Sequence, residues 1–278
     1  MTPGLFTSTN TSDEWSLCNA LGKEKCLSTL DDHWSTFYTR SDIWQIKNAG
    51  LNMIRIPLGY WAVAELEDFE PYVSGQYPYL VRAVNWAQEL DLSVTIDIHG
   101  APGGINGWEE SGLVGPIEFP ANQTNSDRTL TVLRNLTQEF SQAKYGGAVT
   151  NIELLNEPIF ALAELKDFYT AGAKVVGTST GDGINVTIHD AFYNPHSWTN
   201  YDPADAEATK PAEHLTVDTH QFWAFPPLDT LPKPDLLQAI CDFGANQKEP
   251  NNGIPPTLVG EWSLSTGETV YCAIIQSR

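Results

Sequence analysis

Residues 149–158 read VTNIELLNEP, an apolar run that stops at Asn156-Glu157-Pro158. Such a run is typical of a strand buried on both faces, and the proline ends its hydrogen-bonded ladder. A carboxylate at the carboxyl end of a buried parallel strand lies where α/β barrels place their functional groups. The stretch therefore predicts an α/β fold with Glu157 in its functional site.

Residues 257–263, TLVGEWS, repeat this pattern near the other end of the chain. Glu157 and Glu261 each end their own strand, so they can meet in one pocket despite their separation in sequence. Cleavage of a glycosidic bond needs two such groups, because one protonates the leaving oxygen while the other attacks or activates water. The two acids together predict a glycosidase site.

Strands and helices alternate along the chain, which indicates parallel strands joined by right-handed crossovers. A barrel is preferred because polar residues end so many strands, although an open sheet could gather them at its switch point. Residues 1–30 are expected to be irregular. Helices are predicted at 41–49, 78–90, 127–143, 162–176 and 235–243. Strands are predicted at 51–57, 92–99, 149–155, 184–190, 215–220 and 257–263.

Length and charge favour one acidic domain spanning residues 1–278. A net charge of -20 and a pI near 4.4 argue against nucleic acid and anionic membranes as partners. No apolar run is long enough to span a membrane. Nine Trp, ten Tyr and eleven Phe exceed what is usual for so acidic a chain; most fit a core, and the rest can stack on sugar rings.

The cysteines and the sequons bear on cofactors and location. The cysteines lack metal-ligand spacing, so no zinc and no other metal is expected, and their pairing stays open: Cys18, Cys26, Cys241 and Cys272. Four sequons favour a secreted glycoprotein: Asn10, Asn122, Asn135 and Asn185. The opening Met1-Thr2-Pro3-Gly4 has neither the basic nor the apolar part of a signal peptide.

Several strand ends carry polar residues, each of which also has an ordinary structural explanation: Arg55, His99, Asn156, Glu157, His220 and Glu261. Arg55 could be a buried ion-pair partner, and a single histidine is more often structural than catalytic. In the functional interpretation Arg55 hydrogen-bonds the nucleophilic carboxylate and keeps it ionised. The amide of Asn156 then bonds a sugar hydroxyl. Their joint position at strand ends favours this interpretation.

Six segments closely resemble the fungal exo-β-1,3-glucanases of glycoside hydrolase family five, clan A. They follow one another in the family's order. The segments are 49–61 (AGLNMIRIPLGYW), 97–103 (DIHGAPG), 155–158 (LNEP), 189–192 (HDAF), 218–220 (DTH) and 260–263 (GEWS).

The resemblance implies a (β/α)8 barrel that hydrolyses β-glucan with retention and needs no cofactor. Glu157 matches the general acid/base and Glu261 the nucleophile, with Arg55 keeping Glu261 charged. The other residues matching the family's substrate-binding positions are Arg55, His99, Trp108, Glu109, Asn156, His220, Phe225 and Trp262. Trp108-Glu109 stand where the family has Phe-Asp.

The chain departs from the family in three places. Phe222 replaces a tyrosine whose hydroxyl would position the nucleophile. The family's opening segment, with its secretion signal and first strand, is not found before Thr2-Pro3-Gly4-Leu5-Phe6. After Glu261 the resemblance fades, and the family's partner for Cys241 would lie in that last unit. We therefore expect a truncated barrel without its first and last strands.

Two hypotheses remain open. The first is an exo-acting glucan 1,3-β-glucosidase that is secreted or bound to the cell wall by family resemblance, and monomeric. The second is a non-catalytic or impaired glucan-binding remnant. A β-1,6-glucanase or a broad β-glucosidase would use the same carboxylates. Residues 100–107 lack the spacing of a nucleotide-binding loop.

Overall fold

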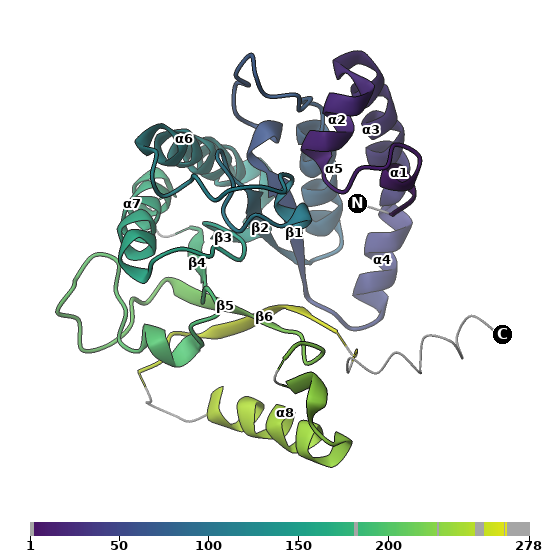
Figure 1. Cartoon of the computed structure of the whole chain (residues 1–278). Coiled ribbons are helices and arrows are strands. Elements are labelled where there is room, and N and C mark those ends of the chain that lie inside the picture. The colour runs from purple at the N-terminus through teal and green to yellow at the C-terminus, as the bar shows by residue number, and fades with distance from the viewer. Residues whose placement is uncertain (1–2, 181–182, 227, 248–252, 264, 266–278) are drawn as a thin grey trace.

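The computed structural model describes residues 3–180, 183–226, 228–247, 253–263 and 265. One sheet of six parallel strands runs in the order β1-β2-β3-β4-β5-β6 (Figure 1). The strands are β1 (Met53–Gly59), β2 (Ser93–Gly100), β3 (Val149–Glu153), β4 (Asn185–His189), β5 (Leu215–Gln221) and β6 (Thr257–Trp262). Each strand pairs with the next one in the chain, which is the order of an α/β barrel. The alternation predicted from sequence is confirmed.

The sheet is strongly curled. In a flat sheet of six strands, β1 and β6 would lie about 24 Å apart, five interstrand spacings. Instead, Arg55 Nη1 on β1 donates to Glu261 Oε1 on β6 at 2.8 Å. The two strands are nevertheless not hydrogen-bonded to each other in the described sheet. The expectation of an incomplete barrel is confirmed, with its open side between β1 and β6.

Helices cover the outer side of the sheet (Figure 1). They are α4 (Arg40–Asn48), α5 (Tyr77–Glu89), α6 (Gln123–Phe140), α7 (Leu162–Thr180) and α8 (Lys233–Gln247). The inward faces follow the 3.6-residue period. Leu133, Leu136 and Phe140 of α6 are buried, as predicted, and so are Leu80 and Val84 of α5. Among the described helices, none combines the length and hydropathy needed to cross a bilayer.

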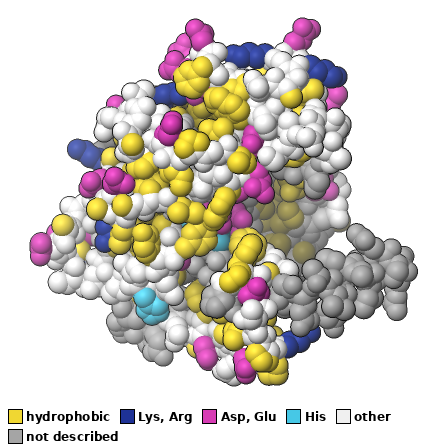
Figure 2. Space-filling model, in the orientation of Figure 1, with side chains coloured by type: hydrophobic (Ala, Val, Ile, Leu, Met, Phe, Trp, Pro, Cys, Tyr) yellow, Lys and Arg dark blue, Asp and Glu magenta, His cyan; other side chains and the backbone are white. Residues whose placement is uncertain are grey.

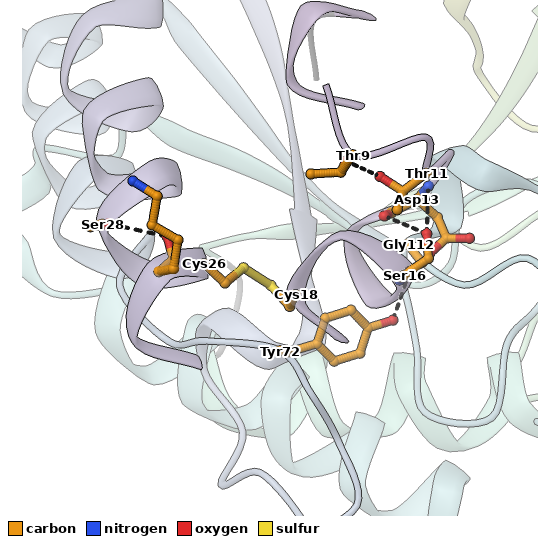
Figure 3. Close-up of a disulfide and its surroundings, with 10 residues drawn as sticks. Thr9, Thr11, Asp13, Ser16, Cys18, Cys26, Ser28, Tyr72 and Gly112 are labelled. Atoms are coloured by element: carbon orange, nitrogen blue, oxygen red, sulfur yellow. Dashed lines mark hydrogen bonds between the residues drawn. A yellow bond between two sulfur atoms is a disulfide. The ribbon is translucent and has the colours of Figure 1, made fainter. Parts of the chain in front are cut away.

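The amino-terminal region contradicts the expectation of an irregular residues 1–30. It forms α1 (Pro3–Thr7), α2 (Glu14–Leu21) and α3 (Lys23–Phe37). The Asp13 side chain caps α2 by accepting the Ser16 N–H at 2.6 Å, and a disulfide between Cys18 and Cys26 joins α2 to α3 (Figure 3). α2 has only eight residues, and the small core of this pair is partly cysteine, so the sequence gives little sign of it.

Glu14, the first residue of α2, is a buried acid outside the predicted site. Its side chain is only 5% exposed, and Oε1 has no hydrogen-bond partner among the described residues. Burial raises the pKa of Glu14 from its ordinary 4.5 to about 7. The folded protein therefore holds a proton that the unfolded chain releases at lower pH.

This proton makes the stability of the fold depend on pH. Below pH 4.5 Glu14 is protonated in both states, and its neutral burial has no electrostatic cost. As pH rises toward about 7 the unfolded chain ionises first, so stability falls by up to about 3 kcal/mol. Glu14→Gln is expected to remove this fall in urea unfolding followed between pH 4.5 and 7.5.

The exposed Glu24 of α3 offers a matched control, because Glu24→Gln removes an acid without changing a buried group. This variant should keep the pH dependence of the parent. Equal slopes of unfolding free energy against pH in Glu14→Gln and in the parent would contradict the assignment.

Candidate active site

Arg55 lies at the centre of the polar cluster inside the curled sheet. Its side chain is 10% exposed. Its guanidinium donates three hydrogen bonds of 2.8 Å: Nε to Glu153, Nη1 to Glu261 and Nη2 to Asn156. These partners come from β3, from β6 and from the loop after β3. One planar fork therefore fixes both the candidate nucleophile and the candidate sugar-binding amide.

Two further buried acids surround Arg55. Asp97 Oδ2 lies 3.2 Å from Nη2 and Asp218 Oδ2 lies 3.3 Å from Nε. Burial alone would lower the pKa of Arg55, but the charges of Asp97 and Glu153 outweigh it and raise the pKa above its ordinary value. Burial and its acidic neighbours raise the pKa of Glu153 well above its usual range. The pKa of Glu153 is thus shifted upward, whereas that of Asp97, despite its burial, is shifted downward by Arg55 and His99.

His220 connects the two candidate catalytic acids. Its Nδ1 lies 2.6 Å from Glu157 Oε1 and 3.8 Å from Glu261 Oε2. The distance between Glu157 Oε1 and Glu261 Oε2 therefore cannot exceed the sum of their distances to this nitrogen. The register pairs His220 with Glu261 on the neighbouring strand. Burial alone would lower the pKa of His220, but contacts with the carboxylates of Asp218 and Glu157 raise it to about 10, so the ring is cationic.

The backbone at Glu157 adopts an unusual conformation. Its φ is 44°, in the left-handed region that non-glycine residues rarely occupy, and Pro158 follows it. Such a conformation costs of order 1–3 kcal/mol and tends to occur at functional sites. The preceding Asn156 N–H donates to Ile98 O on β2 at 2.9 Å, which anchors the turn. This turn places the Glu157 carboxylate beside His220.

Aromatic rings continue outward from His220. On one side they run through His189 and Phe192 to Trp108, with centroids 4.4, 5.2 and 6.0 Å apart. On the other side they run through Phe222 to Phe225, at 6.3 and 6.4 Å. Trp108, Phe192 and Phe225 are exposed. In Figure 2 acidic side chains lie in the middle of the visible face beside a hollow, with hydrophobic side chains around them.

The predicted site residues do not all meet. Arg55, Asn156, Glu157, His220 and Glu261 form one hydrogen-bonded cluster. His99 reaches it indirectly, since its Nδ1 lies 2.6 Å from Asp97 Oδ2. Glu109 and Trp262 are exposed, and within the described ranges neither side chain has a hydrogen bond or ring contact with this cluster.

The sequence reasoning missed several members of the site. Asp97, Glu153 and Asp218 are each fully buried within an otherwise apolar strand. Their positions within predicted buried strands could have indicated this, because a buried acid needs a partner. Arg55 is a cation in another predicted buried strand and could have been recognised as that partner. Glu110 was also missed: it is exposed, and Asn106 Nδ2 donates to its Oε1 at 2.9 Å.

Glu157, His189 and His220 bring one potential ligand atom each to within 4.8 Å of one another. Among the His, Cys, Asp and Glu side chains of the described residues, these three form the group that is close enough together to hold a metal ion. Two nitrogens of the set are already hydrogen-bonded. His189 Nδ1 accepts the Ala191 N–H at 3.0 Å, and His220 Nδ1 pairs with Glu157. The cluster is therefore hydrogen-bonded as it stands.

A curled parallel sheet with paired carboxylates at its strand ends defines an α/β-barrel hydrolase architecture. The chain belongs to glycosyl hydrolase family 5, because the model "Cellulase (glycosyl hydrolase family 5)" matches residues 18–274.

Curated relatives agree with this family. The chain is 39% identical over 270 residues to probable glucan 1,3-beta-glucosidase A of Aspergillus fumigatus, covering 95% of this chain and 61% of that protein. It is 37% identical over 275 residues to glucan 1,3-beta-glucosidase 2 of Wickerhamomyces anomalus, covering 95% and 62%. The chain thus spans about 61% of the length of the curated relatives it matches.

Solved structures show the same fold. A rutinosidase from Aspergillus niger superposes with a TM-score of 0.79 at 24% identity, over 94% of this chain and 75% of that one. Endo-glycoceramidase II from Rhodococcus sp. gives 0.57 at 18% identity, over 86% and 66%. At these identities the likeness concerns the fold alone.

Proposed function

We propose that this site is that of a retaining glycoside hydrolase that releases glucose from β-1,3-glucan, with Glu157 as acid/base and Glu261 as nucleophile. The observation that carries the proposal is the position of both carboxylates around one histidine, with Arg55 bonded to only one of them. Such asymmetry gives two carboxyl groups different roles.

The surroundings of each acid fit its proposed role. Arg55 Nη1 donates to Glu261 Oε1 at 2.8 Å, which favours an ionised nucleophile. Glu157 is 7% exposed, and its contact with His220 allows a proton to be passed and recovered. The combined distance through His220 is compatible with the roughly 5–5.5 Å between carboxyl groups in retaining enzymes.

The substrate class rests on the relatives and on the outer rings. Both curated relatives are named glucan 1,3-beta-glucosidases. Trp108 and Phe225 offer exposed rings on either side of the His220 cluster, as stacking on sugar faces requires. A neutral glucan also suits a chain of net charge -20, which would repel anionic substrates. We assign the remaining predicted contacts to substrate binding: His99, Glu109 and Trp262. The proposal also includes that the protein is secreted and monomeric.

The direct test is hydrolysis of laminari-oligosaccharides of defined length. Glucose should appear first, one residue at a time, and proton NMR of the nascent product should show the β-anomer. Appearance of the α-anomer first would overturn the retaining mechanism. Faster cleavage of β-1,6-linked oligosaccharides would redirect the substrate assignment without changing the catalytic pair.

Phe222 offers a gain-of-function prediction. It directly follows β5, with its ring 6.3 Å from the His220 ring, and stands where the resembling family has tyrosine. Phe222→Tyr is expected to raise kcat by about 10–1000-fold, because a hydroxyl donor toward the nucleophile would be restored. Phe37→Tyr, which adds the same hydroxyl to an exposed ring of α3, is the matched control and should leave kcat within about threefold.

The same residue supports the alternative function. A site that lacks this hydroxyl can retain its sugar contacts while losing turnover. Binding of laminari-oligosaccharides by calorimetry without any release of glucose, and without a gain in Phe222→Tyr, would establish a glucan-binding protein instead.

A further inference from the structure

His189 is a fully buried histidine at the end of β4 that the proposed mechanism does not use. The register pairs it with Asp218 of β5. Its side chain lies against the same His220 that contacts Glu157, with ring centroids 4.4 Å apart and planes at 77°. One of its ring nitrogens lies within 4.8 Å of a carboxylate oxygen of Glu157 and of a ring nitrogen of His220.

The backbone fixes the proton of His189. The Ala191 N–H donates to Nδ1 at 3.0 Å. A peptide N–H cannot act as an acceptor, so Nδ1 must present its lone pair and the neutral ring must carry its proton on Nε2. Among the described residues Nε2 has no hydrogen-bond partner. Ala191 and Phe192 have φ values of 54° and 59°, so the turn that supplies this N–H is itself unusual.

Charged groups surround His189 from several elements. His220 faces it from β5 and Glu157 from the loop after β3, while Asp190 Oδ1 lies 3.8 Å from its Nδ1. Burial, followed by the positive charges of His220, Arg55 and His99, lowers the pKa of His189 well below its usual value. A protonated His189 would be repelled by the cationic His220 ring. It would also lose the hydrogen bond from the Ala191 N–H, because Nδ1 would no longer have a lone pair to accept it.

We propose that His189 is a positioning residue: held neutral by the Ala191 N–H, its ring supports the edge of His220 and thereby sets the bond between His220 and Glu157. This inference rests on the proposed function in so far as Glu157 is the acid/base. It assigns His189 no proton transfer of its own. Without the ring, His220 gains room to turn away from Glu157, and acid assistance to the leaving group weakens.

The kinetic test compares substrates that differ in their need for an acid. His189→Ala should lower kcat/KM for laminaribiose by about 10–100-fold, because a sugar leaving group must be protonated. For 2,4-dinitrophenyl β-glucoside, whose leaving group needs no proton, the loss should stay within about threefold. His189→Phe keeps the ring and should restore most of the laminaribiose activity. The exposed His214 supplies the control, His214→Ala.

His189→Asn separates positioning from a purely structural role. Its side-chain oxygen can still accept the Ala191 N–H, but it has no ring to support His220. The proposal expects His189→Asn to behave like His189→Ala. Restoration by Asn and not by Phe, or an equal loss on both substrates in His189→Ala, would show that His189 only holds the turn and would overturn it.

A second readout needs no turnover. Long-range proton–nitrogen NMR of the resting protein should show His189 as the Nε2–H tautomer from pH 5 to 8. His220 should lose its proton at a lower pH in His189→Ala than in the parent. An unchanged titration of His220 would overturn the inference even in an active protein. Absence of hydrolysis in the parent would instead refute the proposed function, while the NMR result would still decide the role of His189.

Discussion

Glu261→Gln is expected to lower kcat for glucose release from laminari-oligosaccharides by about 10⁴- to 10⁶-fold, the scale of removing a nucleophile. The amide keeps the size of the side chain, and its oxygen can still accept the hydrogen bond from Arg55 Nη1, now 2.8 Å long. What it loses is the negative charge that attacks the sugar in the proposed mechanism. The fold should therefore persist while the first chemical step stops.

Glu157→Gln should give a different pattern. The loss should be about 10²- to 10⁴-fold for oligosaccharides, which depend on acid assistance, and small for formation of the glycosyl-enzyme from 2,4-dinitrophenyl β-glucoside. Added azide should then accelerate turnover of that glucoside, because an anion needs no base to remove a proton from it. Azide should not rescue Glu261→Gln by this route.

The control for both variants is the exposed Glu207, whose change to Gln removes one acid away from the cluster. Thermal unfolding of all three variants should match that of the parent within the usual effect of a surface substitution. Glu157→Gln and Glu261→Gln both retaining activity within about tenfold of the parent would remove the assigned roles.

Arg55→Met is expected to destabilise the fold by about 3–5 kcal/mol, since removing one partner of a buried ion pair leaves the other charges uncompensated. Asp97, Glu153 and Asp218 are fully buried, and all three lie within 3.3 Å of the guanidinium. With a typical stability of about 5–15 kcal/mol for a domain, this loss is a large fraction of the total. Urea unfolding at pH 7 measures it directly.

The pH dependence of this loss has a definite sign. Burial alone would raise the pKa of Asp97, but Arg55 and His99 outweigh it and lower the pKa below its usual value. In the parent this contribution is present above the ordinary carboxyl pKa and is lost as pH falls through the folded value. Arg55→Met lacks most of it already at neutral pH, so the difference between the two proteins should shrink as pH falls below the ordinary carboxyl pKa of 3.8.

Arg55→Lys distinguishes charge from geometry. Lysine keeps a cation but presents a point charge in place of a planar fork. It should recover part of the lost stability, yet it cannot bond Glu153, Glu261 and Asn156 together as Arg55 does. A loss below about 1 kcal/mol in Arg55→Met would show that the acids are protonated or hydrated instead of paired.

The strands could be predicted because each is a short apolar run ended by a polar residue. Parallel strands bring those ends to one side of the sheet, so Asn156, Glu157 and Glu261 could be placed together from their positions alone. Arg55 was also expected at a strand end, but it lies inside β1, four residues before the strand ends at Gly59. The polar strand ends favoured a barrel without excluding an open sheet, since an apolar run looks the same in both, and the resemblance added the second argument for a barrel.

Other features depended on contacts that no local pattern reveals. The α2–α3 pair is held by a cap and by the Cys18–Cys26 disulfide, and four cysteines allow three pairings. Cys272 lies outside the described residues. Glu153 was read as part of an apolar strand because its partner, Arg55, lies on β1, two strands away in the sheet. His189 was visible in a motif, but its fixed proton depends on the backbone turn at Ala191.

The hydrogen bond between Arg55 and Glu261 joins the first described strand to the last. During translation, residue 55 leaves the ribosome long before residue 261. The partners of Arg55 on β2, β3 and β5 are therefore synthesised before its last partner, Glu261. Under the proposed assignment of Glu261 as nucleophile, a nascent chain cannot turn over substrate until β6 has docked. The onset of turnover would then report the arrival of that strand.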